Sequence, residues 1–251
     1  MGMIVAAALL GYCVGVFLNL CADFLPAEPR QSPFQFSRCS VCGAARRPLS
    51  LAGVVADWAG WSRCPQCGAG RGLRAPLVEV ATAAVFAFLA WRYGFGIPFV
   101  FLSLYFAVLI LVTVTDLERR LILDVVTYPA MGLALAGSFF MPHMTPVKAL
   151  IGGAVGFGLF YVLAVVSRGG LGGGDVTLMG FVGLATGFPV VLVAILAGIL
   201  LGGVGAGVML ALRRVGRKSA IAYGPYLVLG AAFALLYGRE FILWYLAPYA
   251  R

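Results

Sequence analysis

Two aspartates at the edges of apolar segments are the strongest candidates for chemistry in this sequence. Asp116 follows the apolar run Ile97–Thr115, and Asp175 follows the glycine-rich residues 169–174 and opens the run Val176–Thr186. A carboxylate at such a place costs several kcal/mol unless it is paired, protonated or solvated. Two close carboxylates cannot both ionise, so that one stays protonated while the other acts as the base on a water attacking a peptide carbonyl. The pair therefore predicts an aspartyl protease site.

Each acid also has a purely structural interpretation. Asp116 would be a solvated helix end beside Arg119 or Arg120, and Asp175 would be a helix N-cap at the positive end of the helix dipole. Asp124, directly before an apolar run, is interpreted most simply as an N-cap. Position alone leaves both interpretations open for Asp116 and Asp175.

A second candidate site is a repeated cysteine motif in the polar region 23–75. Residues 37–44 (SRCSVCGA) return as residues 62–69 (SRCPQCGA). Two residues between cysteines let both sulfurs converge on one ion, and the following glycine permits a positive-φ turn that directs backbone N–H groups at the thiolates. Four thiolates fill a tetrahedral site and leave no position for an activated water, so we predict a structural Zn²⁺. Its predicted ligands are Cys39, Cys42, Cys64 and Cys67.

Other chemistries of these cysteines are disulfides, a redox-active pair or an iron site of the same geometry. A reducing cytoplasm disfavours the disulfides, and a repeated pair of motifs fits a closed structural site better than a single redox pair.

The elements that carry these residues are membrane helices. The chain has 251 residues, of which 62% are hydrophobic and 11% charged, with a mean hydropathy of +1.02. These values exclude a soluble enzyme, a secreted disulfide scaffold and a disordered tail. Because a spanning helix needs about 20 mostly apolar residues, we predict an all-α, polytopic protein with about eight transmembrane helices and a small cytoplasmic zinc-binding module. The predicted runs are Met3–Ala22, Pro76–Trp91, Ile97–Thr115, Val125–Met141, Val147–Val166, Val176–Thr186, Pro189–Leu212 and Ile221–Tyr237, with a break at Gly187, Phe188 and Pro189.

The predicted organisation has three parts: a first transmembrane helix in residues 1–22, a four-cysteine module in 23–75 and a transmembrane aspartyl peptidase domain in 76–251. The net charge of +9 supplies the orientation, since cytoplasmic loops retain Lys and Arg. Fourteen of the 18 Lys and Arg fall on one side of the predicted membrane and four on the other. We therefore expect an outside N-terminus, a cytoplasmic cysteine module and both acids at cytoplasmic helix ends. The charge indicates a membrane orientation and no nucleic-acid partner. The single histidine, His143, falls in an outward loop, away from the acids.

Glycines recur within the apolar runs, which is typical of close helix–helix contacts. The glycines predicted to make such contacts are Gly152, Gly153, Gly156, Gly158, Gly198, Gly202, Gly203, Gly205 and Gly207. Glycines directly before Asp175 would instead let the backbone approach a substrate closely.

The motifs resemble, in their order along the chain, those of bacterial type IV prepilin peptidases. These enzymes are also called leader peptidase/N-methyltransferases and belong to the GxGD class of intramembrane aspartyl proteases. The resemblance is carried by residues 11–19 (GYCVGVFLN), the two cysteine pairs, 75–79 (APLVE), 115–118 (TDLE) with 121–124 (LILD), 172–175 (GGGD) and 223–227 (YGPYL).

The resemblance implies removal of a short basic leader from type IV prepilin or pseudopilin precursors at the cytoplasmic face of the bacterial inner membrane. It also implies methylation of the new N-terminus from S-adenosylmethionine. Asp116 and Asp175 would be the catalytic pair, with Gly172 and Gly174 in the active-site loop. Glu79 and the cysteine module would belong to the methyl-transfer half.

The chain departs from the family pattern near both candidate acids. Leu123 stands where the family commonly has proline, and Thr177 stands where it commonly has lysine. Neither departure removes a proposed catalytic carboxylate.

Non-enzymatic interpretations are a transporter that uses intramembrane acids for coupling and a scaffold that docks a partner through the zinc module. A transporter would be expected to place its acids near mid-membrane and to show an internal helical repeat, and the sequence shows neither.

Overall fold

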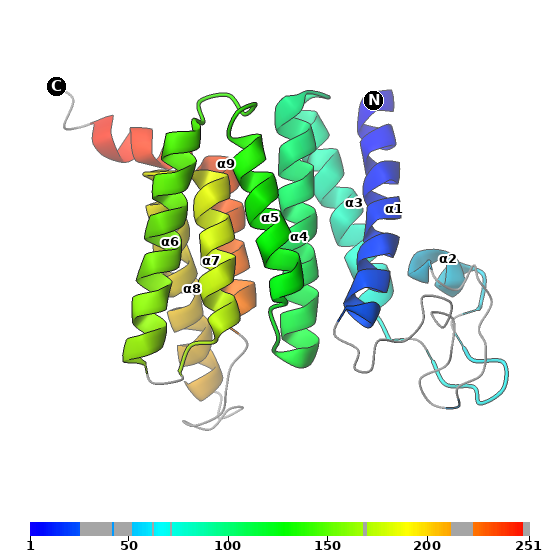
Figure 1. Ribbon diagram of the computed structural model, residues 1–251. Coiled ribbons are helices and arrows are strands. Elements are labelled where there is room, and N and C mark those ends of the chain that lie inside the picture. The colour runs from blue at the N-terminus through cyan, green and yellow to red at the C-terminus, as the bar shows by residue number, and fades with distance from the viewer. Residues whose placement is uncertain are drawn as a thin grey trace. The chain divides into compact units, whose positions relative to one another are not determined.

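The computed structural model describes residues 1–25, 42, 52–61, 63–70, 72–167, 170–211 and 223–247. They form two compact units, Met1–Ser103 and Leu104–Arg251. The helices are α1 (Gly2–Phe24), α2 (Gly53–Trp58), α3 (Arg74–Tyr93), α4 (Ile97–Arg119), α5 (Asp124–Gly137), α6 (Pro146–Val166), α7 (Gly173–Thr186), α8 (Val190–Ala211) and α9 (Gly224–Leu246) (Figure 1). The predicted all-α class is confirmed, and each of the eight predicted apolar runs corresponds to a helix.

The predicted break in the long apolar stretch lies at the expected residues. α7 ends at Thr186 and α8 begins at Val190. Between them Gly187 has a φ of +69°, a value that suits glycine, and the Phe188–Pro189 peptide bond is cis. The apolar stretch therefore forms two helices, which run in opposite directions (Figure 1).

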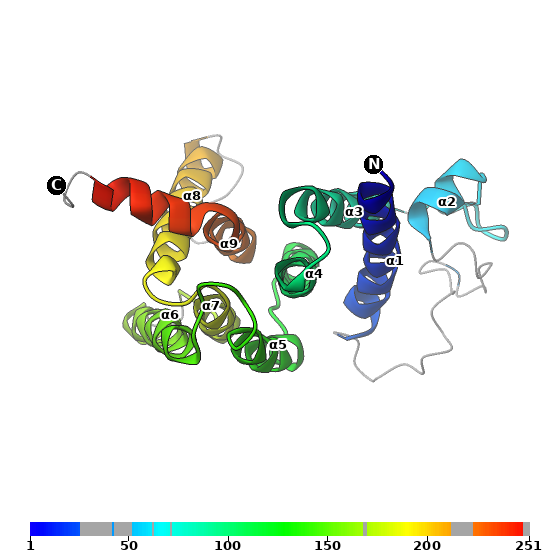
Figure 2. The same ribbon diagram turned by 90° about the horizontal axis from the view of Figure 1, so that it is seen from above.

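Six of these helices are long and apolar enough to cross a membrane: α1, α3, α4, α6, α8 and α9. α5 and α7 have only 14 residues each. α7 is enclosed by protein, because every residue from Asp175 to Thr186 except Leu184 is buried. Seen from above, it lies between α5 and α6, with α8 and α9 on its other side (Figure 2). A helix that protein surrounds does not have to match the hydrocarbon thickness of about 30 Å.

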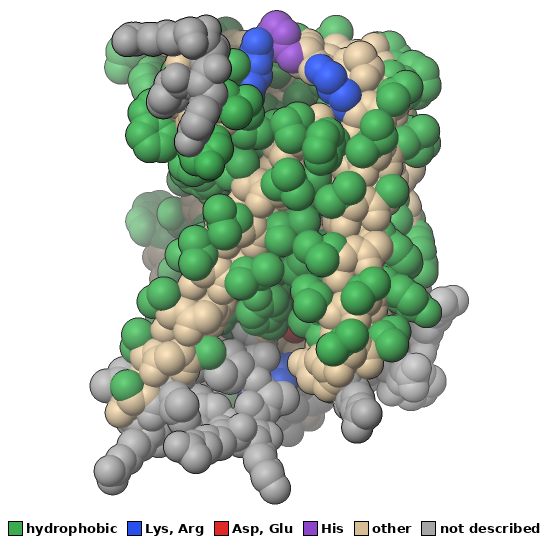
Figure 3. Space-filling model, turned by 90° about the vertical axis from the view of Figure 1, so that its left-hand side faces the viewer, with side chains coloured by type: hydrophobic (Ala, Val, Ile, Leu, Met, Phe, Trp, Pro, Cys, Tyr) green, Lys and Arg blue, Asp and Glu red, His purple; other side chains and the backbone are tan. Residues whose placement is uncertain are grey.

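Unlike α7, the helices α6 and α8 have exposed outer faces. Their large apolar side chains are exposed, among them Leu150, Val162, Leu196 and Leu200. Hydrophobic side chains cover this side of the molecule, and charged side chains lie toward its two ends (Figure 3). This surface is suited to lipid.

Glycines set the close helix contacts of the second unit. A Cβ added at six of the nine predicted contact glycines would lie closer than ordinary van der Waals contact to a neighbouring helix or to the residue before it. These are Gly152, Gly153 and Gly156 on α6, which face α7, and Gly198, Gly202 and Gly205 on α8, which face α9 or the residue before it. An added Cβ at Gly158, Gly203 or Gly207 would meet no described residue within 4 Å, so the described part of the structure shows no close contact at these three.

In the first unit, α1 and α3 pack closely through two glycines one helical turn apart. A Cβ at Gly11 would lie 2.8 Å from Cβ of Phe86, and one at Gly15 would lie 2.7 Å from Cα of Glu79. This spacing places both glycines on one face of α1, so the two backbones approach without intervening side chains.

Candidate active site

Asp116 lies in the last turn of α4 and is 6% exposed. Its Oδ2 accepts a hydrogen bond of 3.0 Å from the backbone N–H of Gly224, the first residue of α9. First-turn N–H groups have no partner within their own helix, and they favour a negative charge. The interpretation of Asp116 as a solvated helix end was therefore wrong, because the side chain is buried and bound to another helix.

Asp175 lies in the first turn of α7 and is 8% exposed. Its Oδ2 accepts a hydrogen bond of 3.2 Å from the backbone N–H of Gly172. The residue does stand at a helix N-terminus, but the N-cap position belongs to Gly172.

Gly174 keeps the start of α7 close to the chain that follows α4. A Cβ added at Gly174 would lie 2.6 Å from Cβ of Ile122. The space left by this glycine is filled by the protein's own backbone and side chain. This contact packs the segment that contains Asp175 against the segment that follows Asp116.

Residues at the start of α9 lie near both acids. The charge of Asp116 acts on the Asp175 carboxyl, so the two lie within electrostatic reach of one another. Burial, and then the nearby charge of Asp175, raise the pKa of the phenol of Tyr223. Tyr223 directly precedes Gly224, which holds Asp116. Of these two neighbouring residues, Gly224 thus contacts Asp116, and Tyr223 lies within electrostatic reach of Asp175. Two acids that act on one another can share a proton, so that one is protonated while the other is ionised.

Asp124 is part of a separate hydrogen-bonded group between α5 and α7. Its Oδ1 accepts a hydrogen bond of 3.0 Å from the hydroxyl of Thr177, which in turn accepts one of 3.2 Å from the hydroxyl of Thr127. The prediction of an N-cap was wrong, since Leu123 occupies that position and Asp124 is the first residue of α5.

The described cysteines of the repeated motif come together. The Sγ atoms of Cys42, Cys64 and Cys67 lie within 4.8 Å of one another, and those of Cys42 and Cys64 are 3.6 Å apart. Gly68 has a φ of +71°, as predicted for the turn after a cysteine pair. The backbone N–H groups of Cys67 and then Gln66 lower the pKa of the Cys64 thiol.

Clustered thiols with a stabilised thiolate are the donor set of a metal site, and they fit the predicted zinc ion. Cys39, the fourth predicted ligand, lies outside the described residues.

Glu79 belongs to the first unit, whereas Asp116 and Asp175 belong to the second. It is fully buried on α3, where it contacts the side chain of Asn19 and the start of α2. The sequence motifs predicted no separate role for Asn19, Tyr223 or Gly224. Asn19 could have been noticed as an amide within an apolar run, and Tyr223 and Gly224 as members of the 223–227 motif.

Comparison with known proteins matches both units. Residues 103–207 match the type IV leader peptidase family, and residues 9–93 match the bacterial Peptidase A24 N-terminal domain. Relatives named prepilin leader peptidase/N-methyltransferase include one from Pseudomonas aeruginosa, 29% identical over 98% of this chain and 94% of the relative. One from Bacillus subtilis is 26% identical over 84% of this chain and 85% of the relative. No solved structure matches the chain.

Proposed function

Because the chain belongs to the type IV leader peptidase family, we propose that it removes the basic leader of type IV pilin-like precursors and N-methylates the new N-terminus. The observation that carries the peptidase half is the pair of buried aspartates within electrostatic reach of one another. The names of relatives that align over nearly the whole chain support both halves.

In the proposed reaction Asp116 and Asp175 share one proton. The ionised carboxylate removes a proton from a water, whose oxygen attacks the scissile carbonyl carbon while the protonated carboxyl donates its hydrogen to the carbonyl oxygen. Collapse of the tetrahedral species breaks the C–N bond, and the leaving amine takes the proton that the first carboxylate had gained. The second carboxylate takes back a proton from one of the two hydroxyl groups, so the product is a carboxylic acid and the pair again holds one proton. The N–H groups of Gly224 and Gly172 each bind one carboxylate and so fix the geometry of the pair.

The loop before Asp175 is the proposed substrate-side edge of this site. Gly172 binds the carboxylate, and Gly174 packs on Ile122. A substrate backbone would approach across Gly173, where an added Cβ would meet no described residue within 4 Å. This combination of packed and open glycines supports the assignment of Gly172 and Gly174 to the active-site loop.

The methyl-transfer half is assigned to Glu79 and the cysteine module. S-adenosylmethionine would supply the methyl group. A Zn²⁺ held by Cys39, Cys42, Cys64 and Cys67 would have all its positions filled, so its role is to hold the module together. The three described thiols within reach of one ion support this assignment.

The enzyme is proposed to lie in the bacterial inner membrane with its N-terminus outside and the cysteine module in the cytoplasm. Substrates of this kind begin with a basic leader followed by an apolar helix, so a cut at the cytoplasmic interface needs the acids on that side. The excess of Lys and Arg on one side of the predicted membrane supports this orientation.

Cleavage of a pilin precursor in membranes tests the peptidase assignment. Asp116→Asn and Asp175→Asn each remove one member of the pair at nearly constant volume, and we expect each to abolish leader removal. Glu240→Gln is the matched control, since it neutralises an exposed acid of the same unit, about 24 Å along α9 from Gly224. Full cleavage by either aspartate variant at normal protein level would show that the pair is not catalytic.

A further inference from the structure

The carboxylate of Glu79 is enclosed and both of its oxygens are occupied. The residue is 0% exposed, although it lies on a helix that is long and apolar enough to cross a membrane. Oε1 accepts a hydrogen bond of 2.6 Å from the backbone N–H of Gly53, and Oε2 accepts one of 2.9 Å from the backbone N–H of Val54. The two donors are the first two residues of α2.

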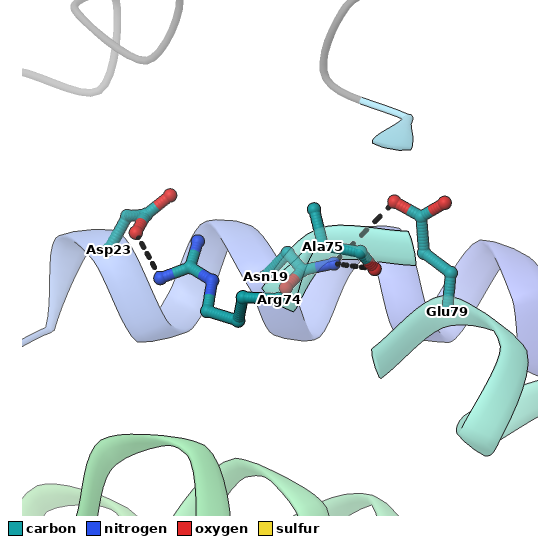
Figure 4. Close-up of polar contacts among 5 residues, drawn as sticks. All are labelled: Asn19, Asp23, Arg74, Ala75 and Glu79. Atoms are coloured by element: carbon teal, nitrogen blue, oxygen red, sulfur yellow. Dashed lines mark hydrogen bonds and ion pairs between the residues drawn. The ribbon is translucent and has the colours of Figure 1, made fainter. Parts of the chain in front are cut away.

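α1 completes this arrangement through Asn19. Its Nδ2 donates to the backbone carbonyl of Ala75 at 3.1 Å and lies 3.5 Å from Oε1 of Glu79 (Figure 4). The same amide thus bridges the first turn of α3 and the carboxylate one turn further along that helix. α1, α2 and α3 meet at one side chain.

The space at this junction admits only glycine at the start of α2. A Cβ added at Gly53 would lie 2.8 Å from both Cβ of Ala75 and the backbone nitrogen of Pro76. Gly53 can therefore bring its N–H to the carboxylate because it has no side chain. The short helix α2 has its first two N–H groups satisfied by a residue from another helix.

We propose that Glu79 is a positioning residue, whose carboxylate docks α2, and with it the cysteine module, onto α1 and α3. Its contribution to methyl transfer, which rests on the proposed function, is then indirect. A fully buried carboxylate with both oxygens bound to main-chain donors is closed off from a methyl donor or an N-terminal amine. Its chemistry is that of a hydrogen-bond acceptor, and no proton transfer is required of it.

Two variants break the same contact from opposite sides. Glu79→Gln keeps the shape of the side chain but turns one acceptor oxygen into an NH₂ donor that faces another donor. Val54→Pro leaves Glu79 intact and removes the N–H that reaches Oε2. Proline is tolerated in the first turn of a helix, and Gly53 before it has no Cβ to clash with the ring. Val54→Ala is the control for the lost valine side chain.

Hydrogen–deuterium exchange of the full chain in detergent is the first test. The Gly53 amide should exchange about ten-fold faster, or more, in Glu79→Gln, as expected when a hydrogen bond to a charged group is lost. It should also exchange faster in Val54→Pro, because loss of the N–H that binds Oε2 loosens the docking of α2 that holds Gly53 against Oε1. Val54→Ala should leave it unchanged. Asp23→Asn is a second control, because it removes the acid of an ion pair between α1 and α3. The partner is Arg74, at an N–O distance of 2.7 Å, and half of the Asp23 side chain is exposed. It should leave exchange at Gly53 unchanged, because that pair is partly solvated. Unchanged exchange at Gly53 in Glu79→Gln would overturn the proposal.

Methylation of a pilin peptide whose leader has already been removed is the second test. A positioning role predicts that Glu79→Gln and Val54→Pro lower the methylation rate to a similar degree, and that the double variant is no slower than the slower single variant. Leader cleavage should stay near the wild-type rate in all three, which also shows that they fold. Loss of methylation in Glu79→Gln with normal methylation in Val54→Pro would overturn the proposal in favour of direct chemistry by Glu79. If the wild-type enzyme methylates nothing, the proposed methyltransferase function fails, while the exchange measurement still decides whether Glu79 docks α2.

Discussion

Gly224→Ala is a sharp test of how the candidate site is built, because it changes neither acid. The added methyl group would lie 2.6 Å from Oδ2 of Asp116 and 3.0 Å from its Cγ. Non-bonded carbon contacts are comfortable at about 3.5 Å or more. Either the carboxylate or the start of α9 must therefore move by roughly 1 Å, and the N–H hydrogen bond to Oδ2 is lost or distorted.

The size of the effect follows from this displacement. A misplacement of about 1 Å in a catalytic constellation can cost about 10²-fold in rate. A hydrogen bond to a charged group contributes about 1.5–3 kcal/mol, which corresponds to a factor of about 10–150. Both routes describe the same disturbance, so we expect kcat/KM for leader cleavage to fall about 10²-fold, with the overall fold retained.

The assay is precursor cleavage in proteoliposomes at equal enzyme content, with Gly158→Ala as the matched control. Gly158 is a helical glycine, and an added Cβ there would meet none of the described residues within 4 Å, so its substitution should leave cleavage unchanged. Methylation of a peptide without its leader reports independently that Gly224→Ala is folded. A Gly224→Ala enzyme that cleaves as fast as the wild type would refute the inference that the start of α9 holds Asp116 in place.

Two further predictions concern the cysteine cluster and the group between α5 and α7. Cys64→Ser should abolish zinc binding, measured as metal content of the purified protein, while Cys21→Ser, outside the motif, should retain it; equal metal content in both would contradict the zinc site. Thr177→Val leaves the hydroxyl of Thr127 and the carboxylate of Asp124 without this partner and should lower the free energy of unfolding by about 1–3 kcal/mol. Thermal unfolding in detergent measures this loss, and an unchanged melting temperature would show that the hydroxyl adds no stability.

Thr177 illustrates how this chain accommodates a departure from its family's pattern. The resemblance leads to the expectation of a lysine at this position, which would place a positive charge beside Asp124. Here a hydroxyl donates to that carboxylate, accepts from Thr127 and lies 3.1 Å from the carbonyl of Gly174. Asp124 is exposed, so water can solvate its charge without a cation.

Much of the architecture could be predicted from local sequence. Apolar runs long enough to satisfy their own hydrogen bonds fixed the helices, and Gly187 with Pro189 located the turn between α7 and α8. The spacing within the cysteine pairs predicted the convergence of Cys64 and Cys67, because ligands two residues apart share one turn. Composition did not predict that α7 would be buried almost throughout, since an apolar helix has the same sequence pattern against lipid as against protein.

The sequence by itself determined which residues could do chemistry: two acids at the ends of apolar runs, a repeated cysteine pair and a glutamate in a membrane segment. Only the tertiary structure decided what holds them. The N–H of Gly224 reaches Asp116 across 108 residues of sequence, and the N–H groups of Gly53 and Val54 reach Glu79 from another helix. Every residue except proline carries such an N–H, so it has no side-chain signature in the sequence. Which N–H faces which carboxylate is set by how the helices pack.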